Sequence, residues 1–118
     1  MLLSKSAILT AKDLAHKDVD VPEWGGTVRI RCMTGNERNA YEVEVLSAHN
    51  ANDHGRLAAL RHKLLAYTVI DERGERIFSD EDLEALGGKS KDVIERLFEV
   101  AQEVSGLNGD AVEDAEGN

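Results

Sequence analysis

The side chains best suited to metal binding or acid–base chemistry in this chain are its four histidines. A helical zinc site pairs two histidines at positions i and i+4 with a glutamate. No pair here has that arrangement. His49 and His54 flank a loop rich in Asn and Asp, His62 stands between two basic residues, and His16 lies in the N-terminal segment. We therefore expect solvated histidines and no metal site.

The acidic residues and the single cysteine form no recognisable reactive site either. Asp80, Asp82 and Glu84 alternate as in a calcium loop, but the glycine and the distal glutamate that such a loop needs are missing. Cys32 ends an alternating Val-x-Ile-x-Cys segment, which predicts a buried strand residue, not a nucleophile activated by a histidine. The sequence thus predicts no catalytic residue and no cofactor, and we expect a protein that is not an enzyme.

Charge is distributed unevenly along the 118 residues, whose formal net charge is −9. Residues 71–118 hold fifteen Asp or Glu against five Lys or Arg, whereas residues 1–70 hold eight acids and nine bases. Binding to DNA or RNA needs clustered Lys and Arg that neutralise phosphates, so we expect no nucleic-acid partner. The acidic half favours a basic protein partner instead.

Composition favours one small cytoplasmic domain of the α+β class. The length suits a single domain. Hydrophobic residues make up 42% of the chain but aromatic residues only 4%, which favours helices packed on a small sheet. The single cysteine excludes an internal disulfide and fits a reducing compartment. No apolar run reaches the length of a signal peptide or a membrane span, so we expect no membrane association.

A β-hairpin is the clearest predicted element of the first half. Residues 4–14 form either a short helix or an irregular segment. After them, apolar and charged residues alternate at 18–21 and 28–32, on either side of a Pro-Glu-Trp-Gly-Gly turn. The polar face of this hairpin would pair acids of the first strand with arginines of the second, namely Asp18 and Asp20 with Arg29 and Arg31.

Two helices are predicted to follow. Thr34 and Glu37 have the spacing of a capping box, which predicts a helix to about residue 48. Residues 41–45 alternate like a strand, but we expect a helix because of the cap. Residues 49–55 read as a loop. Apolar residues at spacings of three and four then predict an amphipathic helix over 57–67.

The second half predicts a short hairpin and two more helices. Residues 69–70 and 77–78 would pair around a turn at 71–74. A serine followed by three acids at 79–82 predicts a helix that Gly87 and Gly88 end, and Ser90 would cap a last helix that reaches to Gly106. We expect one domain over residues 1–107 and a flexible acidic tail over 108–118.

Trp24, in the hairpin turn, is the residue that we single out for partner binding. Aromatic side chains are enriched in protein interfaces, where they bury a large area. Its side chain either covers the local core or contacts a partner or another subunit. The sequence leaves both interpretations open.

In their order, these segments resemble the tail assembly chaperone family of long-tailed bacteriophages with flexible tails (siphovirus type). The resemblance extends over most of the chain, from Leu3 to Leu107. It rests most on three segments, which are VPEWGG at 21–26, MTGNER at 33–38 and FSDEDL at 78–83. None of the three is a catalytic motif, so the resemblance depends on their combination and order.

The resemblance implies a non-enzymatic assembly factor in the cytoplasm of the infected host cell, absent from the mature virion. Members of this family bind the long tape measure protein, keep it soluble and deliver it to tail tube protein that polymerises around it. A long helical ruler exposes apolar stripes until the tube encloses it, and such patches invite aggregation. Covering a long filament requires many copies, so we also expect self-association.

The same resemblance implies a second, longer product of a programmed −1 ribosomal frameshift, whose extension recruits tail tube protein. Glu116-Gly117-Asn118 can be encoded as GAG-GGA-AAC, which contains the slippery heptamer G-GGA-AAC. We therefore expect the shorter product to end at or beside this site.

Two other functions remain as alternatives. One is a structural tail completion component, which would stay in the virion. The other is an acidic DNA mimic that inhibits a nucleic-acid-binding protein of the host by spacing carboxylates like phosphates. The nearly neutral residues 1–70 disfavour the DNA mimic.

Overall fold

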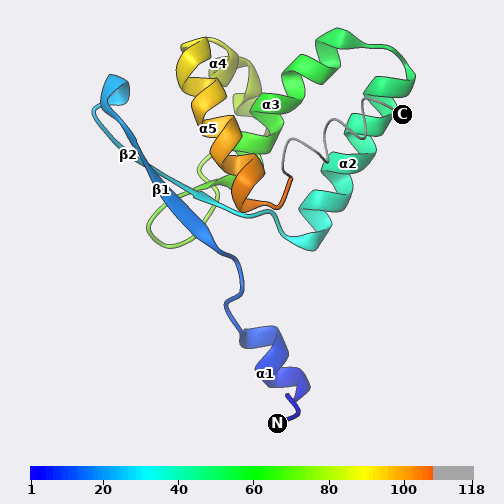
Figure 1. Cartoon of the computed structure of the whole chain (residues 1–118), viewed down its shortest axis with the longest axis vertical. Coiled ribbons are helices and arrows are strands. Elements are labelled where there is room, and N and C mark those ends of the chain that lie inside the picture. Colours follow the sequence, from blue (N-terminus) through cyan, green and yellow to red (C-terminus); the bar gives the residue numbers. More distant parts are fainter. Residues whose placement is uncertain (108–118) are drawn as a thin grey trace.

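A three-stranded antiparallel sheet and five α-helices make up residues 1–107, the part of the chain that the computed structural model describes (Figure 1). The strands lie in the order β1-β2-β3. The predicted single α+β domain is confirmed, while the predicted tail at 108–118 lies outside the described residues. In chain order the elements are α1 (Lys5–Thr10), β1 (His16–Val21), the 3-10 turn η1 (Pro22–Trp24), β2 (Gly26–Arg31), α2 (Gly35–Asn50), α3 (His54–Thr68), β3 (Val69–Ile70), the 3-10 turn η2 (Asp80–Asp82), α4 (Leu83–Gly87) and α5 (Lys91–Val104).

Strands β1 and β2 form the predicted hairpin because apolar and polar residues alternate along both of them. Val19 lies opposite Val28, and Val21 and Ile30 are fully buried on the same face. Gly25 closes the turn with a φ of 77°, a left-handed conformation that glycine adopts without strain. Helices α5 and α3 pack on the sheet, and α2 packs on α3 (Figure 1). The core therefore lies between the sheet and these helices.

The polar face of the hairpin confirms one predicted ion pair and corrects the other. Asp18 lies opposite Arg29, whose Nε and Nη2 donate to the two carboxylate oxygens at 2.8 and 3.0 Å. This hydrogen bonding holds the pKa of Asp18 below its ordinary value. Asp20 instead accepts from the Thr27 hydroxyl at 3.1 Å. The prediction for Arg31 was wrong, because its side chain turns into the interior where β2 ends.

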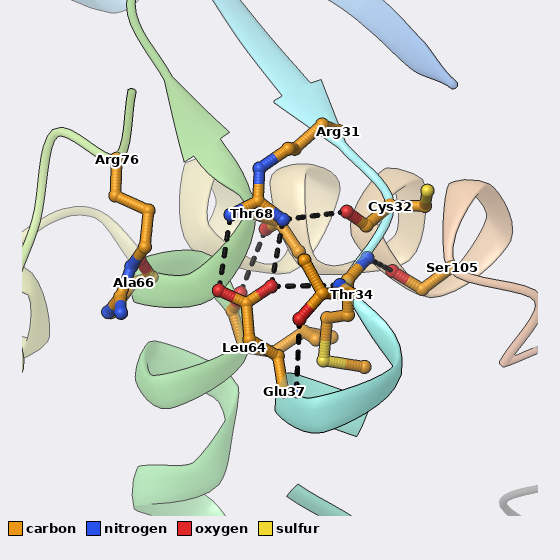
Figure 2. A network of polar contacts seen from close by, with 10 residues as sticks. Arg31, Cys32, Thr34, Glu37, Leu64, Ala66, Thr68, Arg76 and Ser105 are labelled. Carbon is orange, nitrogen blue, oxygen red and sulfur yellow. Dashed lines mark hydrogen bonds and ion pairs between the residues drawn. The ribbon is translucent and has the colours of Figure 1, made fainter. Parts of the chain in front are cut away.

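Arg31 forms a buried ion pair with Glu37 in the first turn of α2 (Figure 2). The two side chains are only 9% and 15% exposed. The guanidinium donates from Nη1 to Oε1 at 2.8 Å and from Nη2 to Oε2 at 3.1 Å, and Nη1 also donates to the Cys32 carbonyl at 2.8 Å. Such bidentate, charge-assisted contacts are strong and directional. They fasten the end of the sheet to the start of α2.

The predicted capping box at the start of α2 uses the same carboxylate. The backbone N–H of Glu37 donates to Thr34 Oγ1 at 3.1 Å, and the backbone N–H of Thr34 donates to Glu37 Oε1 at 2.9 Å. Beside it, the backbone N–H of Met33 donates to Ser105 Oγ at 3.2 Å, just beyond the end of α5 (Figure 2). Ends of β2, α2 and α5 therefore meet at one polar junction.

Helix α2 is continuous from Gly35 to Asn50, so the helical interpretation of residues 41–45 is confirmed. Tyr41 and Ala48 face the core, and burial raises the pKa of Tyr41 to about 12. The cap and the packing of this face outweigh the strand-like alternation.

The second predicted hairpin is shorter than expected. Only Val69 and Ile70 form a strand, which pairs with β2, and the returning segment is reduced to a bridge between Ile70 and Arg76. The turn is as predicted, with Gly74 at a φ of 86° and its N–H donating to the Asp71 carbonyl. The segment after it divides into η2 and α4.

Three local predictions need correction. Cys32 is half-buried and follows β2 instead of lying within the strand, because the chain already turns towards α2 there. Ser90 precedes α5, but its side chain makes no capping hydrogen bond. Helix α3 begins at His54, inside the predicted loop, because the Asp53 carboxylate accepts from the N–H of Arg56 and caps the helix.

Removal of the Glu37 carboxylate tests the junction. In Glu37→Ala the charge of Arg31 stays buried without its partner, and loss of one member of a buried pair costs about 3–5 kcal/mol. We expect the free energy of unfolding in urea to fall by about that amount. The matched control is Glu42→Ala, which breaks an exposed i,i+4 pair with Arg38 and should cost less than about 0.5 kcal/mol. Equal losses in the two variants would contradict this account.

The polar junction also predicts that the stability of the fold depends on pH. Burial raises the pKa of Glu37, but hydrogen bonds from Arg31 and from the Thr34 N–H, with the nearby positive charges, lower it overall below the ordinary 4.5. A carboxyl whose pKa is lower in the folded state contributes its full stabilisation above its unfolded pKa and loses it as the pH falls through the folded value. We expect stability to decline below about pH 4.5, and less steeply in Glu37→Gln. Urea midpoints that decline equally in both proteins would argue against it.

Candidate protein-binding surfaces

Within residues 1–107, no group of three or more His, Cys, Asp or Glu side chains could hold a metal ion. His16 and His54 are exposed, while His49 and His62 are partly buried. The ring of His62, on α3, lies close to Gly87, where an added Cβ would come to 3.4 Å from it. Burial, and then the charge of Arg61, lower the pKa of His62. None of the helices within residues 1–107 combines the length and the apolar composition that a membrane span requires. Residues 1–107 also expose three apolar features, at Trp24, on α2 and before β1.

Trp24 lies at the closed end of the hairpin and lines an apolar groove. Its side chain is 38% exposed. The groove has a volume of about 170 Å³, and its lining includes Leu65 and Leu97 at the core side and Ile77 and Phe78 towards solvent. We call this feature the Trp24 groove. The role of Trp24 in partner binding stays a prediction.

Acidic residues border a wider and more open hollow that shares two apolar residues with the Trp24 groove. This hollow has a volume of about 600 Å³ and includes residues 79–82. Lys63 Nζ donates to Asp80 Oδ1 at 2.8 Å and lowers the pKa of Asp80. Glu81 is exposed and forms no ion pair within residues 1–107. Arg76 also lines this hollow, so its lining holds three acidic side chains and one basic side chain.

Helix α2 carries a second apolar surface on its outer side. Ala40, Val43 and Leu46 are exposed, with Val43 at 67% and Leu46 at 59%. A spacing of three places them along one side of the helix, while Tyr41 and Ala48 face the core. We call these three exposed residues the α2 stripe. Helix α2 therefore has an apolar surface that nothing in residues 1–107 covers.

The N-terminal arm, residues 1–14, is the third unpaired apolar feature. Every one of its residues is exposed, and α1 has no buried residue. Figure 1 shows α1 set apart from the sheet and the other helices, joined to β1 by an extended segment. The large apolar side chains that the arm exposes are Met1, Leu2, Leu3, Ile8, Leu9 and Leu14.

Comparison with known protein families identifies the family to which the chain belongs. The family model described as phage tail assembly chaperone matches residues 3–118. The chain belongs to the phage tail assembly chaperone family. Membership implies interaction with phage tail proteins and agrees with the resemblance seen in the sequence.

A solved tail assembly chaperone has the same fold. The structure of the bacteriophage HK97 tail assembly chaperone matches with a TM-score of 0.57 and 22% sequence identity, over 88% of this chain and 92% of that chain. No curated protein sequence matches the chain.

Two of the three surfaces of this tail assembly chaperone were not predicted from the sequence. The signal for the α2 stripe was present, because Ala40, Val43 and Leu46 are three residues apart within a predicted helix. As a strand, residues 41–45 would place Val43 on the same face as Tyr41 and Val45, which obscures this spacing. For the arm, the sequence signal is the presence of four leucines among its first fourteen residues.

Proposed function

We propose that this tail assembly chaperone binds the tape measure protein, keeps it soluble and helps tail tube protein assemble around it, without catalysing a reaction. The observation that best supports this function is the uncovered α2 stripe. A protein that shields apolar stripes on a long helical partner needs an exposed apolar surface of its own, held rigidly and surrounded by polar groups.

The α2 stripe suits an amphipathic helix as its partner. Two helices pack when the ridges of side chains on one fit the grooves on the other, at an interaxial distance of about 8–10 Å. The small Ala40 side chain allows close approach, while Val43 and Leu46 supply the buried area. The capping box and the Arg31–Glu37 pair hold α2 in place. Rigid presentation of this kind reduces the entropy that is lost on binding.

The net charge of −9 supports the solubilising part of the proposal. A complex covered by chains of like charge repels other complexes and resists aggregation. Basic segments of a partner would in addition be attracted to the acidic chaperone, which speeds association at low salt.

Glutamine substitutions on α2 test the proposed binding surface. Val43→Gln with Leu46→Gln removes two exposed apolar side chains without disturbing the core, so stability should change little. We expect capture of a purified tape measure segment, fused to a soluble carrier, to weaken at least about tenfold. On co-expression, the tape measure protein should be soluble with the unaltered chaperone and mostly insoluble with the double variant.

The matched control is Ile8→Gln with Leu9→Gln, which removes two exposed apolar side chains from the arm instead. This variant should capture the tape measure segment as the unaltered chain does. A tape measure protein that stays insoluble even with the unaltered chaperone would refute the proposed function. Equal capture by both double variants and by the unaltered chain would refute the assignment to α2.

We further propose that the chain is the shorter product of a −1 frameshift at residues 116–118 and acts in the cytoplasm of the infected cell. The proposal is supported by the family membership and by the codons that these residues allow. The longer product would carry the extension that recruits tail tube protein.

Mass spectrometry of infected cells and of purified virions tests both statements. In cell lysates we expect peptides of this chain and of a longer product that shares its first residues and continues in the −1 frame. In purified virions we expect neither. Stoichiometric recovery from virions would favour a structural tail completion component, and a gene without a slippery heptamer at these codons would remove the frameshift.

A further inference from the structure

We propose that the Trp24 groove is a second contact site for the tape measure protein and takes one large apolar side chain from a segment that also carries a lysine or arginine. This inference rests on the proposed function and extends it, because the α2 stripe then holds a different segment of the same partner. It specifies the chemistry of the new segment. A basic residue three or four positions from the apolar one would lie on the same side of a helix.

The Trp24 groove has the size and the lining to receive one large apolar side chain. Its volume is about 170 Å³, and an apolar cavity of about 150 Å³ holds a benzene-sized molecule. Leu65 and Leu97 line its core side and are each 1% exposed, while Trp24 and Ile77 line it towards solvent. Drug-sized ligands need about 300–1,000 Å³, so a single side chain fits better than a small organic molecule.

An ion pair holds the hairpin turn, and with it Trp24, against α5. Arg96 Nη2 donates to both carboxylate oxygens of Glu23, the residue before Trp24, at 2.8 and 2.9 Å. This hydrogen bonding lowers the pKa of Glu23. Because both side chains are exposed, the pair orients the turn more than it stabilises the fold. Trp24 therefore stands beside the groove before any partner binds.

Polar contacts hold the other wall of the groove, the segment that contains Ile77 and Phe78. Arg76 Nε donates to the Ala66 carbonyl at 2.8 Å, and the guanidinium carbon lies 5.0 Å from the centre of the Tyr67 ring. The turn η2, which follows this segment, is tied to α3 by the ion pair between Lys63 and its first residue. Because both walls are in place before binding, little conformational entropy is lost when a side chain enters.

The open hollow beside the groove favours a basic residue in the same segment. Asp80 is already paired with Lys63, and Arg76 donates to a backbone carbonyl. Glu81 is exposed and forms no ion pair within residues 1–107. The hollow shares two apolar residues with the groove, so a lysine or arginine close to the inserted side chain would meet this carboxylate. Opposite charges across an interface fix its register.

The groove and the α2 stripe lie on different sides of the domain. Among residues 1–107, none from α2 lines the groove. Figure 1 shows α2 on the side of α3 that faces away from the hairpin turn. Two different segments of a long partner are therefore needed to fill both sites.

Effective concentration favours the tape measure protein as the source of the second segment. A groove that takes one side chain buries little area, so it binds a separate protein only weakly. Once the α2 stripe holds one segment, a nearby segment of the same molecule has an effective concentration on the order of millimolar. The weak contact is then occupied, and the two contacts together bind more tightly than either alone. A separate partner would not gain this advantage.

The fluorescence of Trp24, the only tryptophan of the chain, tests the proposal. Overlapping short peptides that cover the tape measure protein, with any tryptophan replaced by phenylalanine, are titrated into the full-length chaperone. The chaperone is first diluted until its own emission no longer changes with concentration. Peptides that combine a large apolar residue with a nearby lysine or arginine should shift the emission to shorter wavelength, because the inserted side chain removes water from the indole ring.

Two variants with matched controls locate the contact. Ile77→Asp should weaken binding of these peptides at least about tenfold, whereas Leu9→Asp, at an exposed apolar residue outside the groove, should leave it unchanged. Glu81→Lys should weaken binding about three- to tenfold at low salt, and less as salt rises. Glu99→Lys makes the same change of charge at an exposed position of α5 and should have a smaller effect. Circular dichroism checks that each variant is folded.

Three outcomes would overturn this inference. The emission of Trp24 stays unchanged with every tape measure peptide that binds the chaperone. Alternatively, the peptides bind Ile77→Asp and Glu81→Lys as tightly as the unaltered chain. In the third outcome, purified tail tube protein shifts the emission and no tape measure peptide does, which would assign the groove to tail tube protein instead.

The α2 double variant separates this inference from the proposed function. Val43→Gln with Leu46→Gln should bind the groove peptides as the unaltered chain does. A longer tape measure fragment that carries both segments should bind at least about tenfold more weakly to this variant and to Ile77→Asp alike. Peptides whose binding is lost only in the α2 double variant would refute this inference alone. Binding of no tape measure peptide at all, with an insoluble tape measure protein on co-expression, would refute the proposed function.

Discussion

The ion pair between Arg31 and Glu37 is the interaction on which the arrangement of the other elements depends. A charge so close to full burial is tolerated only with a partner in good geometry, and the bidentate contact supplies one. The same carboxylate caps α2, so the direction in which α2 leaves the sheet is linked to the position of β2. Because Ser105 bonds to the same turn, the end of α5 is held there as well.

Local patterns in the sequence were enough to predict the order and type of nearly every element. The alternation around Pro22 to Gly26 predicted the hairpin, and Thr34 with Glu37 predicted the start of α2 despite a strand-like segment. Tertiary contacts could not be predicted in this way. Arg31 continues a polar alternation and was assigned to the solvent side, but the turn towards α2 buries it. The residues of β2 do not indicate where Glu37 will lie in the folded chain.

The binding surfaces were less predictable than the fold, for a related reason. Trp24 could be selected because a large aromatic side chain in a turn is unusual in this chain. The groove beside it, however, is made by residues from β2, β3, α3, α4, α5 and the 77–78 segment. The α2 stripe depends on which side of α2 the core covers. An amphipathic pattern shows that a helix has an apolar side. It does not show that the helix has a second apolar side, which the fold of its own chain leaves exposed.

The isolated helix α1 has little to hold it in its helical conformation. It has six residues and no buried side chain, and isolated helices shorter than about 12–15 residues are only marginally stable in water. Its support within the described residues is the cap in which Ser4 Oγ accepts from the N–H of Ala7. Unfolding of α1 exposes no core side chain, so residues 5–10 can gain and lose helical structure while the sheet and the other helices stay folded.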